Sequence, residues 1–276
     1  SFGGAALMGL ALSLAAFSRA ELLLMSVLVI TPMVLLVKQW DWRTRLFALV
    51  IAGMTSAAIL APWVAFNLSR FEEPVYLSEG YQITLATSTC DATYYGDYTG
   101  YWSITCPQQF LAEEGLTAEN SDQSERSVVL LEKSIDYIQE NITRVPTVVV
   151  VRWLRIVGLW KPLQQSDVDA YLEGRDLWVT RIAQATSYAF MALAAAGVVI
   201  MRRRRIPVLP LIGPLIAIFI TITITFAQNR YRASVEPAIA ILAAVAVEQI
   251  VRGWLALRDD PEDDETSADR EERALT

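Results

Sequence analysis

Two arginines flanking a tyrosine, Arg230-Tyr231-Arg232, lie in a short link between two apolar segments. Each segment has about twenty residues, the length that spans a bilayer. A guanidinium is costly against lipid tails, and its planar fork of donors fits phosphate oxygens. The link is therefore a candidate anion site at a membrane face. The alternative is that Arg230 and Arg232 reach lipid headgroups and only anchor the two helices.

Two acidic residues belong to the same candidate site. Glu236 lies one turn into the last apolar segment, where a carboxylate is costly unless it is paired. Arg232, four residues earlier, is its natural partner, and a purely structural clamp is the alternative. Arg19 and Glu21 separate the first two apolar segments. The predicted substrate-binding residues are Arg19, Glu21, Arg230, Tyr231, Arg232 and Glu236.

The composition indicates a membrane protein. The chain has 276 residues, 54% of them hydrophobic, with a mean hydropathy of +0.35, which is rare for a soluble domain. We expect a mainly α-helical polytopic protein of about six spans, by the length rule for bilayer-crossing helices. The first two segments are short for spans and favour a tight helical hairpin over one kinked helix. The segments are residues 3–17, 22–37, 46–66, 182–201, 206–227 and 233–251.

Basic residues set the predicted orientation, because positive charge near span ends marks the cytoplasmic face. With six spans, three basic clusters share that face: Lys38 to Arg45, Arg202 to Arg205, and Arg252 with Arg258. Residues 1–66 and 182–258 then hold three spans each, in the plasma membrane. Residues 67–181 form an extracytoplasmic domain, on the same face as the Arg19 hairpin and the Arg-Tyr-Arg link.

Charge and residue type exclude several functions. Residues 259–276 hold nine acids and two arginines, which accounts for the net charge of −7. We expect this tail to be disordered and cytoplasmic. The absence of histidine excludes histidine-based catalysis and histidine metal ligands within this chain. No zinc spacing, nucleotide fingerprint or glycine-rich phosphate loop occurs, so no metal, cofactor or nucleic-acid site is predicted here.

The extracytoplasmic segment is predicted to be a small mixed α/β domain. Residues 81–87 alternate in a β-like manner. Apolar residues from Val128 to Ile142 recur at helical spacing, with Ser124 as the expected cap and Pro146 as the expected end. Cys90 and Cys106 are expected to form a disulfide on this oxidising face, with unpaired thiols as the alternative.

Residues 147–160 form an apolar run that Arg152 and Arg155 interrupt. Its short length favours a helix in the membrane interface over a span. Trp153, Trp160, Lys161 and Pro162 are typical interfacial anchors. If this run spanned the membrane, everything after it would change sides, which the basic clusters argue against.

Four motifs occur in order along the chain. They are Gly9–Glu21 (GLALSLAAFSRAE), Ala61–Asn67 (APWVAFN), Ser134–Asn141 (SIDYIQEN) with Arg152–Arg155 (RWLR) and Trp160–Pro162, and Arg230–Pro237 (RYRASVEP). Together they resemble the C-terminal part of GT-C membrane glycosyltransferases, the protein-mannosyltransferase-like and aminoarabinose-transferase-like enzymes. The likeness covers about residues 3 to 255. Phe66 stands where the family has an arginine, so the resemblance supports no phosphate contact there.

The resemblance implies transfer of a sugar from a polyprenyl-phosphate donor to an extracytoplasmic acceptor, which is a protein, lipid or glycan. It implies that Arg230, Arg232 and Arg19 hold the phosphate and stabilise charge on the leaving group. The catalytic Asp of the family lies in the first outer loop, expected upstream of Ser1, so we expect a fragment that is inactive alone. The resemblance leaves open a divalent metal in the full-length enzyme.

A non-enzymatic membrane protein, transporter-like or an assembly subunit, is the alternative function. Transport is favoured by broken helices with charges at the membrane midplane. Pro207, Pro210 and Pro214 cluster at one end of their apolar segment, and no midplane ion pair is evident in the sequence. An acidic first outer loop upstream would favour the transferase instead.

Overall fold

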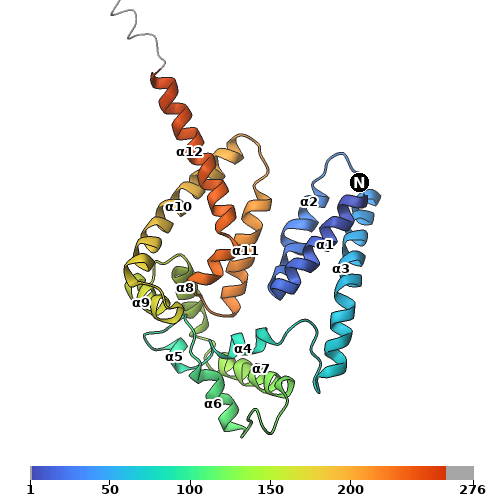
Figure 1. Ribbon diagram of the computed structural model, residues 1–276, viewed down its shortest axis with the longest axis vertical. Coiled ribbons are helices and arrows are strands. Elements are labelled where there is room, and N and C mark those ends of the chain that lie inside the picture. Colours follow the sequence, from blue (N-terminus) through green and yellow to red (C-terminus); the bar gives the residue numbers. More distant parts are fainter. Residues whose placement is uncertain (1, 259–276) are drawn as a thin grey trace, which may run out of the picture. The chain divides into compact units, whose positions relative to one another are not determined.

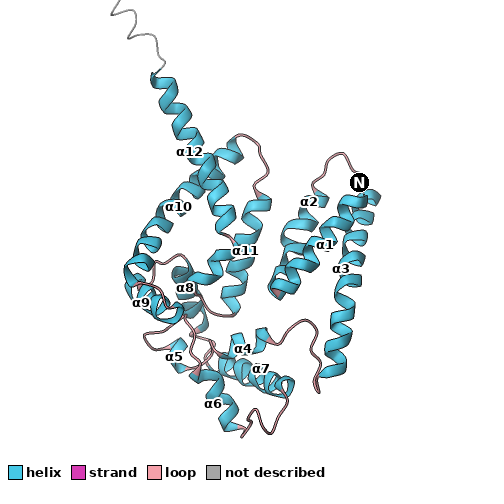
Figure 2. Cartoon of the chain, in the orientation of Figure 1, coloured by secondary structure: helices cyan, strands magenta, loops and turns pink. Residues whose placement is uncertain are grey.

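The computed structural model describes residues 2–258, and this part of the chain is mainly helical, without a strand (Figure 2). The expected acidic tail lies outside the described residues. The chain divides into two compact units. The first is Ser1–Gln184 with Leu209–Val235, and the second is Ala185–Val208 with Glu236–Thr276.

The prediction of a mixed α/β domain is wrong. Residues 81–87, predicted as a strand, lie in and just after helix α4 (Gly80–Ala86), where the Thr84 hydroxyl donates to the Gly80 carbonyl. Leu85 and Ala86 are buried, and α4 packs against α7 (Gln123–Glu140). An alternation this short does not separate strand from helix, and the apolar surface offered by α7 decides the outcome.

Helix α1 (Phe2–Ser18) packs closely along α3 (Trp42–Arg70), as Figure 1 shows. Gly9 permits the approach, since a Cβ there would lie 2.3 Å from the Ala52 carbonyl oxygen. Ser13 lies one turn on and its hydroxyl is 3.0 Å from the Ser56 hydroxyl. Small residues and shared hydroxyls are the usual contacts between membrane helices, because they let backbones come close.

The chain turns at Arg19, whose backbone is extended, and returns beside α1. The returning segment comprises η1 (Ala20–Leu23), a π-helical turn η2 (Ser26–Ile30) and α2 (Thr31–Leu35). Ala5, near the start of α1, packs with Val34 near the end of α2 and with Ala48 of α3. This packing places Arg19 and Glu21 at the tip of a helical hairpin.

Three helices of the described residues are long and apolar enough to cross a membrane: α3, α10 (Leu177–Arg203) and Glu236–Ala256 within α12 (Glu236–Arg258). The other apolar helices are shorter: Phe2–Ser18, Ala20–Leu35 and α11 (Leu209–Ile224). The structure thus supports a helical membrane protein with three candidate spans, where about six were expected by the length rule.

In the sequence, a group of smaller helices lies between α3 and α10. They are α4, α5 (Asp91–Tyr94), α6 (Thr105–Glu113), α7, α8 (Val145–Ile156) and α9 (Pro162–Glu173). Ala86, Phe110 and Leu130 form a buried cluster where α4, α6 and α7 meet. A disulfide joins Cys90 to Cys106, whose Cα atoms are 5.5 Å apart.

The predicted ends of helix α7 need correction. Its N-cap is Asp122, which forms a capping box with Glu125, whereas Ser124 lies inside the helix. The helix ends at Glu140, and Pro146 lies in the first turn of α8. Proline suits a first helical turn, because its missing N–H has no partner there anyway.

The second unit pairs the C-terminal half of α10 with α12. Gly197 allows the contact, since a Cβ there would lie 1.9 Å from the Leu242 carbonyl oxygen. At the arginine-rich end of α10, Arg204 binds Glu248 at 3.0 Å and Gln249 at 2.6 Å. At least one arginine of the basic cluster Arg202 to Arg205 therefore stabilises this helix pair directly.

Candidate functional site

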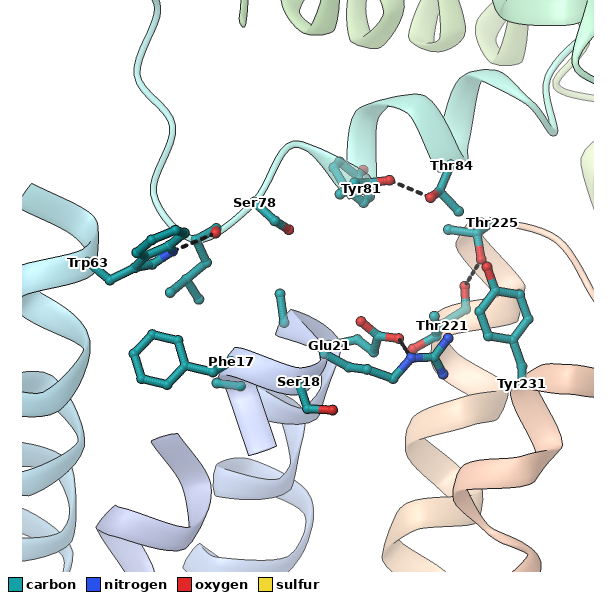
Figure 3. A pocket seen from close by; sticks show the side chains of 15 residues that line it. Phe17, Ser18, Glu21, Trp63, Ser78, Tyr81, Thr84, Thr221, Thr225 and Tyr231 are labelled. Atoms are coloured by element: carbon teal, nitrogen blue, oxygen red, sulfur yellow. Dashed lines mark hydrogen bonds and ion pairs between the residues drawn. The ribbon is translucent and has the colours of Figure 1, made fainter. Parts of the chain in front are cut away.

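A cavity of about 710 Å³ lies in the first unit, between segments that are distant in sequence (Figure 3). The end of α1 and the Arg19–Glu21 turn form one side, and Trp63 of α3 contributes to another. The loop before α4 and its first turns, α11, and the link that follows α11 close the rest. The cavity therefore depends on segments from both ends of the first unit.

Arg19, Glu21 and Tyr231 meet in this cavity. The Nε of Arg19 lies 3.4 Å from Oε1 of Glu21, and its Cζ lies 4.9 Å from the centroid of the Tyr231 ring. A guanidinium over an aromatic face is attracted by the negative face of the ring. These contacts hold the Arg19 guanidinium at the cavity. They join the turn after α1 to the link η3 (Asn229–Ser234).

Tyr231 is the buried member of the Arg-Tyr-Arg link, with 8% of its surface exposed. Burial raises the pKa of the Tyr231 hydroxyl, while the positive charges of Arg230 and Arg19 act in the opposite direction. The raised pKa means that the hydroxyl stays protonated near neutral pH. It can therefore donate a hydrogen bond to an anion.

The other three predicted residues, Arg230, Arg232 and Glu236, do not line the cavity. Arg230 is exposed, with its Cζ 5.8 Å from the centroid of the Tyr231 ring. Arg232 is half-buried within η3. Glu236 begins α12, which belongs to the second unit. Three of the six predicted residues thus meet at one cavity, and Arg230 adds positive charge beside it.

The hydroxyl groups of the cavity were not predicted. Ser18, Ser78, Tyr81 and Thr84 line it together with Thr221 of α11 and Thr225, which directly follows α11 (Figure 3). Apart from Ser18, which lies in the Gly9–Glu21 motif, these residues belong to no sequence motif, and only the fold gathers them. Glu21 is the one carboxylate among the lining residues. A cavity with one guanidinium, one carboxylate and several hydroxyls suits a polar, anionic, hydroxyl-rich ligand.

Two side chains of α3 hold the loop that forms the rim of the cavity. The indole Nε1 of Trp63 donates to the Leu77 carbonyl at 3.0 Å. The amide of Asn67, which is buried, donates to the Tyr76 carbonyl at 3.2 Å. The structure therefore gives two residues of the Ala61–Asn67 motif, Trp63 and Asn67, a role in positioning the loop.

Two buried arginines of α8 bind backbone carbonyls. Arg152 donates from Nη1 to the carbonyls of Thr223 (2.8 Å) and Ile224 (3.2 Å), and from Nη2 to that of Ser88 (3.1 Å). Thr223 and Ile224 end α11, so Arg152 binds carbonyls that have no partner within the helix. Burial lowers the pKa of Arg152 to about 10, so it remains charged at neutral pH.

Arg155 fixes the disulfide loop in the same way. Its Nε donates to the Thr99 carbonyl at 2.6 Å and its Nη2 to the Asp97 carbonyl at 3.1 Å. Burial lowers the pKa of Arg155 to about 10. Residue type predicts no partner for either arginine, because the partners are backbone atoms distant along the chain.

Within residues 2–258, no group of three or more Asp, Glu, Cys or His side chains could hold a metal ion. Comparison with known proteins gives no match to a family model, a curated protein or a solved structure.

Proposed function

We propose that the chain is part of a membrane glycosyltransferase that moves a sugar from a polyprenyl-phosphate donor to an extracytoplasmic acceptor. In this proposal the three shorter apolar helices complete about six spans, by the membrane-length rule with its allowance for short or tilted helices. The cavity faces outward and the acidic tail is cytoplasmic. The observation that carries the proposal is the meeting of Arg19, Glu21 and Tyr231 around one cavity.

The donors of Arg19 support a phosphate ligand. Its Nε lies against Glu21, and no acceptor within the described residues binds its terminal amino groups. Those amino groups carry four of the five N–H donors of a guanidinium, by the usual donor inventory. A guanidinium with open donors beside a neutral tyrosine hydroxyl fits phosphate oxygens, and Arg230 adds long-range positive charge.

The remaining cavity surface suits the other parts of the donor. Hydroxyls from Ser18, Ser78 and Thr84 can exchange hydrogen bonds with sugar hydroxyls, and the rings of Phe17 and Trp63 offer apolar surface to a prenyl chain. In the transfer step the acceptor oxygen bonds to the anomeric carbon as the carbon–oxygen bond to phosphate breaks. Positive charge at Arg19 and Arg230 stabilises the departing phosphate.

The resemblance assigns the general base to a carboxylate upstream of Ser1. That group would take the proton of the acceptor hydroxyl. The resemblance leaves open a divalent metal in the full-length enzyme. In this proposal the described residues hold the donor phosphate and form the wall opposite the catalytic group.

The test compares transfer and donor binding by full-length protein with Arg19→Ala, and with a combined Arg230→Ala/Arg232→Ala variant. We expect Arg19→Ala to weaken binding of a polyprenyl phosphate roughly 10- to 100-fold, the usual effect of losing a charge-assisted hydrogen bond. Binding of the uncharged polyprenol should change little. Arg175→Ala is the matched control, because that arginine is exposed and pairs with Glu173.

Unchanged transfer and binding in folded variants would remove these arginines from the mechanism. A parent protein that binds neither donor and transfers no sugar would favour the alternative, a transporter-like protein or an assembly subunit. The native upstream sequence gives a second discriminator, since the transferase requires an acidic first outer loop.

A further inference from the structure

A buried polar network fixes the residue that precedes the Arg-Tyr-Arg link. The Nδ2 of Asn229 donates to Oδ2 of Asp169 at 2.8 Å and to Oε1 of Gln184 at 3.1 Å. Its Oδ1 accepts from Nε2 of Gln165 at 3.1 Å. Both amide hydrogens and the amide oxygen of Asn229 are therefore engaged, which leaves one orientation for this side chain.

Asp169 connects this network to the disulfide loop. Its Oδ1 accepts from the Tyr101 hydroxyl at 3.0 Å, while Oδ2 accepts from Asn229. Asp169, Tyr101 and Gln165 are each at most 4% exposed. A buried hydrogen-bond network of this kind holds a single arrangement, because losing one bond leaves a polar group unsatisfied away from water.

The backbone beside the network is held as well. Ala227 donates from its backbone N–H to the Gly100 carbonyl at 3.1 Å. Gln228, which follows it, is 1% exposed. The chain thus enters η3 from a fixed position, and Tyr231 reaches the cavity two residues after Asn229.

From this geometry we propose that Asp169 is the positioning residue of the Arg230–Tyr231–Arg232 link. It acts through Asn229 and touches neither the cavity nor a ligand. By fixing Asn229, it sets where the Tyr231 ring meets Arg19 and where Arg230 places its charge. The effect on phosphate binding rests on the proposed function, whereas the effect on the link does not.

Asp169→Asn is the primary test, because it keeps the size of the side chain and removes its charge. Tyr101 and Asn229 now each donate to one carboxylate oxygen. In the variant one of these two donors will face an amide N–H instead of an oxygen, so that one hydrogen bond is lost. We expect backbone amides of residues 230–234 to exchange hydrogen roughly 10- to 100-fold faster, the equivalent of one lost hydrogen bond to a charged group. Asp167→Asn is the matched control on the same helix, since Asp167 is half-exposed and pairs with Arg181 at 3.0 Å.

Two further variants keep the proposal testable if Asp169→Asn unfolds the protein. Tyr101→Phe removes one hydrogen bond to Asp169 and keeps the ring, so it should accelerate the same amides several-fold. The reciprocal pair Asp169→Asn with Asn229→Asp restores complementarity, because the new amide at 169 can donate to the new carboxylate at 229. The carboxylate at 229 can no longer donate to Oε1 of Gln184, so the Gln184 amide must rotate to present its N–H groups. We therefore expect the slow amide exchange of residues 230–234 to recover only in part.

The binding assay separates positioning from a loss of fold. With a polyprenyl phosphate as probe, Asp169→Asn should weaken binding, and with the uncharged polyprenol it should not. The positioning role would be overturned if amide exchange at residues 230–234 in Asp169→Asn stayed within threefold of the parent rate. It would also be overturned if the reciprocal pair exchanged no more slowly than Asp169→Asn alone. If the parent binds no polyprenyl phosphate, the proposed function fails, and the exchange data still decide the role of Asp169.

Discussion

Truncating Arg152 should destabilise the protein more than any exposed arginine substitution. Arg152 is 3% exposed and binds three backbone carbonyls, at 2.8, 3.2 and 3.1 Å. Arg152→Ala leaves these carbonyls without their donor and opens a void between α8 and the end of α11. Each buried carbonyl left unsatisfied costs about 1–3 kcal/mol.

The charge of Arg152 works against part of this stabilisation. Burial lowers its pKa to about 10, which means that the folded environment disfavours the charged form. Removing the charge therefore returns some free energy, and we expect a net loss of about 3–5 kcal/mol, which is below the summed cost of three unsatisfied carbonyls. Arg152→Met fills the space and should cost less than Arg152→Ala.

Thermal unfolding in detergent measures the effect. A loss of about 3–5 kcal/mol lowers the melting temperature by roughly 10 °C in a chain of this size. Arg175→Ala, at an exposed ion pair, should stay within about 2 °C. An Arg152→Ala protein that melts together with the Arg175→Ala control would refute the view that Arg152 caps α11.

Two further predictions concern stability. Burial raises the pKa of Glu79, and neither of its buried oxygens has a hydrogen-bond partner within the described residues. A carboxyl with a raised folded pKa loses stability as pH rises through that value. Glu79→Gln should therefore flatten the decline in melting temperature between pH 4.5 and 8 and stabilise the protein by about 1 kcal/mol at pH 8. A variant that declines as steeply as the parent would contradict this. Cys90→Ser/Cys106→Ser opens a loop with a sequence separation of 16. It should cost about 3 kcal/mol, seen as a lower melting point that reductant no longer changes. Equal melting of parent and variant under oxidising conditions would count against a stabilising disulfide.

The sequence predicted features that depend on local pattern. The apolar spacing from Val128 to Ile142 indicated a helix, and α7 covers most of it. The alternation in residues 81–87 misled, because burial of Leu85 and Ala86 against α7 is a tertiary effect. The same limit applied to the ends of α7, where Asp122 rather than Ser124 supplies the capping oxygen.

The parts that could not be predicted share one physical cause. Arg152 and Arg155 bind carbonyl oxygens, and every residue carries a carbonyl, so residue type gives no signal for the partner. Sequence placed Arg19 and Tyr231 on one predicted face by charge bias alone. Their contact depends on how the turn after α1 and the link after α11 are held in the first unit.

The arginines of the first unit differ in what their donors bind. Arg152 and Arg155 direct theirs to buried carbonyls, and burial lowers the pKa of both. Arg19 has a side chain that is 31% exposed, one carboxylate neighbour and a position at a cavity rich in hydroxyls. A guanidinium needed only for packing would be expected to bind acceptors from the chain, as the two buried arginines do. The open donors of Arg19 are therefore the feature that most favours an external anion. Because Asn229 is fixed by neutral amides and one carboxylate, the link can present Tyr231 beside Arg19 without using another arginine to hold it in place.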